Sequence, residues 1–121
     1  MKKYLSLLIL ALSCSANANE INKETWISGM TSALPAAFCE SKQYFRQCFS
    51  ITATQCEETA LSVTRICLNK YKSDLPDVLV QPKDGTHWGS IVGRCAGETY
   101  ETVLIKKRIN SQKCNDPGNW M

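Results

Sequence analysis

The sequence lacks long hydrophobic runs and has almost no excess of charge. A membrane-spanning helix needs about 20 consecutive apolar residues, and the longest mainly apolar stretch covers only residues 5–12. Lys and Arg number 14 against 11 Asp and Glu, a net charge of +3. Nucleic-acid-binding domains carry a strongly basic surface, so this near balance argues against that class. The length of 121 residues fits one domain.

Patterns that indicate catalysis or cofactor binding are also scarce. The only histidine is His87, so a triad-type hydrolase has a single candidate base. The carboxylate pairs Glu57/Glu58 and Glu98/Glu101 are expected at solvated helical positions rather than in a cleft. No cysteine pair has the C-x-x-C spacing of zinc or redox motifs, and no glycine-rich phosphate loop is present. We therefore expect no enzymatic activity, no metal and no cofactor.

The first 18 residues have the features of a removable signal peptide. A lysine-containing start precedes an apolar core at residues 5–12, and residues 16–18 (Ala-Asn-Ala) supply the small side chains that signal peptidase requires. We expect cleavage after Ala18 and a single mature domain of residues 19–121 in the bacterial periplasm. A lipoprotein acylated at Cys14 is the alternative, although the residues before this cysteine make a poor lipobox.

Seven cysteines in so short a chain predict a disulfide-stabilised domain. Removal of the leader takes Cys14 away and leaves an even number for pairing: Cys39, Cys48, Cys56, Cys67, Cys95 and Cys114. Their successive spacings of 9, 8, 11, 28 and 19 residues do not suit a metal clamp. The sequence therefore predicts three structural disulfides formed in an oxidising compartment.

Hydrophobic periodicity predicts helices through most of the mature chain and almost no strands. Asn22 is expected to cap a first helix, which Pro35 ends or bends. A short helix is expected at residues 41–48. Thr52 and Gln55 have the spacing of a capping box and should open a longer helix. The inward face of that longer helix is predicted to comprise Cys56, Ala60, Val63, Cys67 and Tyr71.

The last long helix is predicted to begin at a Thr86 cap and to run to about Ile109. Its inward stripe is predicted to comprise Trp88, Val92, Cys95, Thr99 and Val103. Three glycines spaced four residues apart lie on a neighbouring face: Gly89, Gly93 and Gly97. Each costs about 1 kcal/mol of helix stability relative to alanine. This predicts close packing on that face, either within the monomer or against a second copy in a homodimer.

The helices restrict how the cysteines can pair. Cys56 and Cys67 lie eleven residues apart on one helix, about 16 Å, which is too far for a disulfide. In an antiparallel hairpin of the two long helices, Cys67 and Cys95 lie equally far from the connection and should pair. The other four allow three pairings, of which two are favoured, the first over the second: Cys39–Cys48 with Cys56–Cys114, or Cys48–Cys56 with Cys39–Cys114.

These expectations together predict an all-α fold and a protein that acts by binding. The fold is a compact helical bundle with a long antiparallel helical hairpin, cross-linked by three disulfides. A rigid turn and exposed aromatic side chains make good interface anchors, so the predicted partner-binding residues are Lys83, Asp84, His87, Trp88 and Trp120. The alternative is a small periplasmic or secreted carrier of an apolar ligand, because helical six-cysteine scaffolds can enclose a lipid-sized cavity.

The leader, the expected disulfides and a helical body of about 100 residues resemble the small periplasmic immunity proteins of type VI secretion systems. The resemblance is one of size, compartment and pattern. It implies a protein that binds and blocks a peptidoglycan-degrading effector of the muramidase or amidase type, with a homodimer as an expected form.

Overall fold

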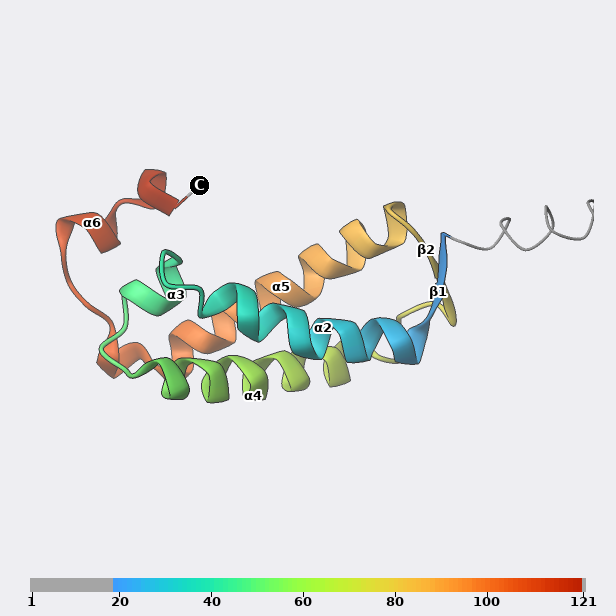
Figure 1. The fold of residues 1–121 in the computed structure, drawn as a ribbon, viewed down its shortest axis with the longest axis horizontal. Helices are drawn as coiled ribbons and strands as arrows, with labels where there is room; N and C mark the ends of the chain where they lie inside the picture. Colours follow the sequence, from blue (N-terminus) through green and yellow to red (C-terminus); the bar gives the residue numbers. More distant parts are fainter. Residues whose placement is uncertain (1–18, 121) are drawn as a thin grey trace, which may run out of the picture.

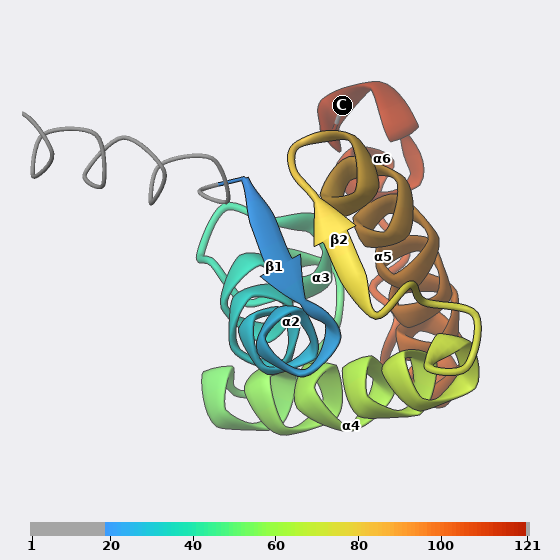
Figure 2. The ribbon, with the colours of Figure 1, turned by 90° about the vertical axis from the view of Figure 1, so that its right-hand side faces the viewer.

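The computed structural model describes residues 19–120, in which three long helices are accompanied by short helices and one small sheet (Figure 1). In chain order the elements are β1 (Glu20–Asn22), α2 (Lys23–Phe38), α3 (Tyr44–Gln47), α4 (Ala53–Tyr71), β2 (Val78–Val80), α5 (Lys83–Val103), η2 (Ile105–Lys107), α6 (Gln112–Asn115) and η3 (Pro117–Trp120). Figure 2 shows α4 lying across both α2 and α5, so the long helices form two layers. No helix among these residues is long and apolar enough to cross a membrane.

The first long helix, α2, begins where the sequence predicts and ends later. The Asn22 side chain accepts a hydrogen bond from the Thr25 N–H at 2.8 Å, which confirms the predicted cap. Pro35 does not end the helix, because its carbonyl still accepts a hydrogen bond from the Cys39 N–H at 3.1 Å. A proline inside a helix removes its own N–H donor and crowds the carbonyl four residues before it, yet α2 continues past the buried Pro35 to Phe38.

Helix α4 confirms the predicted capping box. The Gln55 N–H donates to Thr52 Oγ1 at 3.1 Å, and the Thr52 N–H donates to Gln55 Oε1 at 2.9 Å. The predicted inward face is buried at Cys56, Ala60, Val63 and Cys67 and half-buried at Tyr71. Both predictions rest on neighbouring residues, which is why the sequence suffices for them.

The last long helix, α5, is displaced from its predicted bounds. It begins at Lys83 rather than after Thr86, because the Thr86 N–H is already bonded to the Pro82 carbonyl at 2.9 Å. It ends at Val103 instead of near Ile109, because the chain then turns to pair with the α3–α4 connection. There the Ile109 N–H donates to the Cys48 carbonyl at 2.8 Å.

The buried line of α5 also differs from the predicted stripe. Val92 is fully buried as expected, but Val103 is 58% exposed. Ala96 and Tyr100 are fully buried instead, and the Tyr100 ring packs edge-on against Phe45 and Phe49. The helix is therefore rotated toward this aromatic cluster, which comes from α3 and the segment after it.

The structure differs from the sequence-based predictions in a short helix and in a small sheet. The helix predicted at residues 41–48 is confined to Tyr44–Gln47, because the Gln43 N–H bonds the Glu40 carbonyl in a preceding turn. The fold is also not purely α-helical. Strand β1 pairs antiparallel with β2, with Ile21 opposite Leu79. Leu79 is fully buried, so this ribbon covers one end of the helices.

All six cysteines predicted to remain after leader removal are paired. Cys67–Cys95 joins α4 to α5 with a Cα–Cα distance of 5.9 Å, as predicted from the hairpin. The other two bonds are Cys39–Cys56 and Cys48–Cys114, with Cα–Cα distances of 5.8 and 5.6 Å. Both favoured pairings of these four cysteines were therefore wrong.

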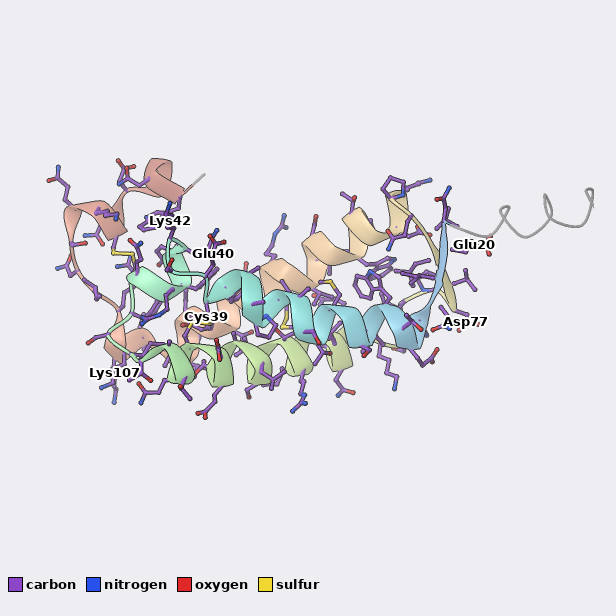
Figure 3. All side chains as sticks on the ribbon, viewed as in Figure 1. Glu20, Cys39, Glu40, Lys42, Asp77 and Lys107 are labelled. Atoms are coloured by element: carbon purple, nitrogen blue, oxygen red, sulfur yellow. A yellow bond between two sulfur atoms is a disulfide. The ribbon has the colours of Figure 1, made fainter. Side chains whose placement is uncertain are left out.

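The error has a clear structural cause. Helix α2 packs against α4 in the opposite direction, so the end of α2 meets the start of α4 (Figure 1). Figure 3 shows Cys39 at this junction, where its disulfide reaches α4. The cysteine spacing restricts only the α4–α5 hairpin and does not reveal this second antiparallel contact.

Candidate functional site

The first turns of α5 hold four of the predicted partner-binding residues. Lys83 and His87 are exposed, and the His87 ring lies edge-on to Trp88 with centroids 5.1 Å apart. Trp88 is half-buried against the core. The Asp84 carboxylate accepts a hydrogen bond from the Val80 N–H at 2.7 Å. Asp84 therefore holds the β2 strand to α5, while Lys83 and His87 remain available to a partner.

Trp120 does not join this group. The C-terminal segment lies at the end of the molecule opposite to the start of α5 (Figure 1). The structure therefore separates the predicted partner-binding residues into two surfaces, and whether either surface binds a partner stays a prediction.

The three glycines of α5 have different surroundings. A Cβ added at Gly89 or Gly93 would meet nothing within 4 Å, whereas one at Gly97 would lie 3.1 Å from Phe45 Cζ. Glycine at position 97 therefore leaves room for the Phe45 ring. Among residues 19–120, no helix backbone packs closely against Gly89, Gly93 or Gly97. The homodimer prediction for Gly89 and Gly93 remains open.

The densest polar cluster lies where α3, α5 and the C-terminal segment meet. The Tyr44 hydroxyl donates to Glu101 Oε1 at 2.5 Å and accepts from Arg108 Nε at 2.8 Å. Arg108 also donates to the Cys114 carbonyl at 2.8 Å and to the Ile109 carbonyl. One guanidinium thereby ties two helices to the tail, and Glu101 is half-buried rather than solvated as the sequence suggested.

The electrostatics of this cluster keep the tyrosine protonated. Burial raises the pKa of Tyr44 above its usual value, the hydrogen bond to Glu101 raises it further, and Arg108 partly opposes both effects. The phenol is therefore a hydrogen-bond donor at neutral pH, and the Glu101 carboxylate is its acceptor. This arrangement braces the contact between α3 and α5.

A second set of contacts fastens the end of the chain. The Trp120 ring lies edge-on to Tyr44 with centroids 5.7 Å apart, and its indole N–H donates to the Lys113 carbonyl at 3.2 Å. The Lys113 ammonium lies 5.4 Å from the Trp120 ring centroid and donates to Gln47 Oε1 at 2.8 Å. Trp120 is therefore half-buried and anchors the tail, in place of the exposed anchor that was expected.

Beside this cluster runs an open groove of about 410 Å³, lined by Glu98, Glu101, Thr102 and Ile105. Ile105 is 64% exposed, and Val103, two residues before it, is 58% exposed. The exposed pair Glu57/Glu58 lies on a different helix, α4, and His87 lies at the far start of α5. Within residues 19–120, no three His, Cys, Asp or Glu side chains converge as a metal site would require.

No local sequence pattern indicates the Tyr44–Glu101–Arg108 cluster. The hydrogen bonds join residues 57 and 64 positions apart. A local pattern cannot reveal such a pairing. Arg108 ends a Lys-Lys-Arg run that follows α5, which stops at Val103.

Comparison with known proteins identifies a family. Residues 20–115 match the family described as NttA, a substrate of the type II secretion system (T2SS). No curated protein and no solved structure matches. The resemblance to type VI immunity proteins was therefore wrong, and with it the inhibition of a peptidoglycan-degrading effector. The match gives no support to the apolar-ligand carrier either. The export expected from the leader agrees with a secretion substrate and with three disulfides.

Proposed function

The chain belongs to the NttA family of type II secretion substrates, and we propose that it is itself secreted through that system as a folded, non-catalytic protein that acts outside the cell. The family match over residues 20–115 carries this proposal, because it covers nearly all of the predicted mature domain. A final location beyond the periplasm would revise the compartment predicted from the leader alone.

The cross-links support passage in a folded state. Disulfides form in the oxidising periplasm, and here they connect α2 to α4, α4 to α5, and the α3 end to the tail. A chain closed in this way stays compact on leaving the periplasm. Such cross-links contribute about 2–4 kcal/mol each to stability, which suits a protein that works without cellular chaperones.

The non-catalytic part of the proposal is supported by where the candidate groups lie. His87 is exposed at the start of α5 and lies edge-on to Trp88, far from the Glu101 carboxylate, which accepts a hydrogen bond from Tyr44. A nucleophile, a base and an orienting group have to lie within hydrogen-bond reach of one another for nucleophilic catalysis of the triad type. In the Tyr44–Glu101–Arg108 cluster, the polar groups instead form hydrogen bonds with one another.

Secretion can be tested by comparing a parent strain with one that lacks the outer-membrane channel of its type II system. We expect the protein in the culture medium of the parent and in the periplasm of the mutant, measured by immunoblot of each fraction. A periplasmic marker enzyme controls for leakage, and a variant without residues 2–18 controls for export and should stay in the cytoplasm. Equal amounts in both media would refute the proposed route.

A further inference from the structure

Two of the three disulfides join cysteines that are not successive in the mature sequence. Only Cys67–Cys95 connects neighbours in the cysteine order. The bond from Cys39 to Cys56 skips Cys48, and Cys48 is bonded to Cys114, the last cysteine of the chain. The two bonds therefore interleave, since Cys48 lies between Cys39 and Cys56 while its partner lies beyond both.

Export presents the cysteines in an order that favours a different pairing. A chain that enters the periplasm with its N-terminus first exposes Cys39 and Cys48 to oxidation long before Cys114 arrives. Loop-closure probability falls with about the three-halves power of loop length, so a 9-residue separation is favoured about twentyfold over the native 66-residue separation of Cys48. The first bond expected is thus Cys39–Cys48, which the native structure does not contain.

The helix packing that selects the native partner comes late. Cys39 meets Cys56 only when α2 lies against α4, and α4 continues to Tyr71. Until α4 has formed and packed against α2, no native contact favours Cys56 over Cys48 as the partner of Cys39. Early bonds are therefore chosen by sequence distance rather than by the fold.

Within residues 19–120 the folded protein holds no free thiol that could correct a wrong bond. Cys48, Cys56 and Cys67 are fully buried, Cys114 is 7% exposed, and Cys39 and Cys95 are half-buried. All six are paired, so no described cysteine is left with a free thiol. Exchange requires a thiolate in contact with a disulfide sulfur, so correction has to come from another molecule before the core closes.

We propose that this protein is a substrate of a periplasmic thiol–disulfide isomerase, which rearranges its bonds after a dithiol oxidase has formed them. For each bond formed, two cysteine thiols lose two electrons and two protons, and the disulfide of the oxidase takes them up and becomes a dithiol. The rearrangement itself involves no net oxidation. This inference depends on export into an oxidising compartment and not on the route by which the protein later leaves the cell.

The exchange balances for a chain with the non-native bonds Cys39–Cys48 and Cys56–Cys114. The isomerase thiolate attacks the sulfur of Cys48, which forms a mixed disulfide and releases the Cys39 thiolate. That thiolate attacks the sulfur of Cys56, which forms the native Cys39–Cys56 bond and releases the Cys114 thiolate. The Cys114 thiolate then attacks Cys48, which completes Cys48–Cys114 and returns the isomerase thiolate.

The test expresses the full chain, with its leader, in two strains that differ only in the periplasmic isomerase. Free thiols are alkylated at harvest, and bonds are mapped by mass spectrometry after trypsin and chymotrypsin, which together cut after Lys42, Arg46 and Phe49. We expect the Cys48–Cys114 peptide to fall severalfold without the isomerase and a Cys39–Cys48 peptide to appear. Equal native bonds in both strains would overturn the proposal.

Two double variants make the test specific. Cys48→Ala with Cys114→Ala leaves Cys39–Cys56 and Cys67–Cys95, which now join successive cysteines, so its maturation should not depend on the isomerase. Cys67→Ala with Cys95→Ala keeps the interleaved bonds and should remain dependent. The reverse result for either variant contradicts the proposal.

A measurement on wild-type protein covers the case in which a variant fails to fold. The purified protein is reduced, unfolded and refolded in a glutathione buffer with or without purified isomerase. Native bonds should form severalfold faster with the enzyme, and an unchanged rate would overturn the proposal.

Discussion

Tyr100 shows how a single polar atom fixes the aromatic core. Its side chain is fully buried, and its hydroxyl donates to the Phe45 carbonyl at 2.8 Å. Tyr100→Phe would leave that carbonyl without this partner, so we expect a loss of about 1–2 kcal/mol in the free energy of unfolding. Urea denaturation at neutral pH measures the loss, and an unchanged midpoint would show that the hydrogen bond contributes nothing.

The same hydroxyl predicts how stability depends on alkaline pH. Burial raises the pKa of Tyr100 to about 12, from an ordinary value of 10 in the unfolded chain. The stabilising effect of the neutral phenol is fully present below pH 10 and is lost as pH rises through 12, because the unfolded chain releases the proton first. Urea midpoints between pH 9 and 12 should fall more steeply for wild type than for Tyr100→Phe. Parallel curves would contradict this assignment.

Thr64 is the opposite case, a buried hydroxyl that no described group satisfies. Its side chain is fully buried in α4, and Oγ1 has no hydrogen-bond partner among residues 19–120. Thr64→Val replaces the hydroxyl by a methyl group of the same shape, so we expect a gain of about 1 kcal/mol in the free energy of unfolding. Thermal unfolding measures it, with Thr64→Ala as a cavity control that should lose stability. A destabilised valine variant would mean that the hydroxyl has a partner.

At the scale of an element, the glycines of α5 offer a matched pair. Gly93→Ala adds a methyl group in open space and should stabilise the helix by up to about 1 kcal/mol. Gly97→Ala should lose about 1–3 kcal/mol, because its Cβ would press on the Phe45 ring, which is stacked on Phe38. Thermal unfolding of both variants tests this, and equal effects would contradict the packing described.

The elements also show how far the sequence can predict the fold. The Asn22 cap and the Thr52/Gln55 capping box were predicted correctly because each depends on residues three apart. The end of α5 was predicted incorrectly, because the Ile109 N–H bonds the distant Cys48 carbonyl instead of continuing the helix. The β1–β2 pairing escaped prediction for the same reason, since Ile21 and Leu79 are distant in the chain. The polar cluster around Arg108 likewise depends on contacts that only the folded chain creates.

For the whole molecule, the cross-links dominate stability. They close separations of 17, 28 and 66 residues, and each is worth about 2–4 kcal/mol in typical cases. A domain of this size has a total stability of about 5–15 kcal/mol, so complete reduction should unfold it. Circular dichroism at 37 °C before and after reduction in urea and removal of the urea tests this, with alkylation to prevent reoxidation. A reduced protein that keeps its helical signal and a cooperative melt would contradict it.

The two-stranded sheet has a consequence for the removal of the leader. Strand β1 starts one residue after the Asn19 carbonyl, which accepts a hydrogen bond from the Gln81 N–H at 2.7 Å. Its partner β2 lies almost 60 residues later, so β1 stays unpaired until most of the domain has crossed the inner membrane. The predicted cleavage site after Ala18 is therefore adjacent to unpaired backbone for that whole interval, and a protease can bind such backbone. Once the ribbon closes, the same bond is next to a paired strand, so processing is expected to precede folding of this end.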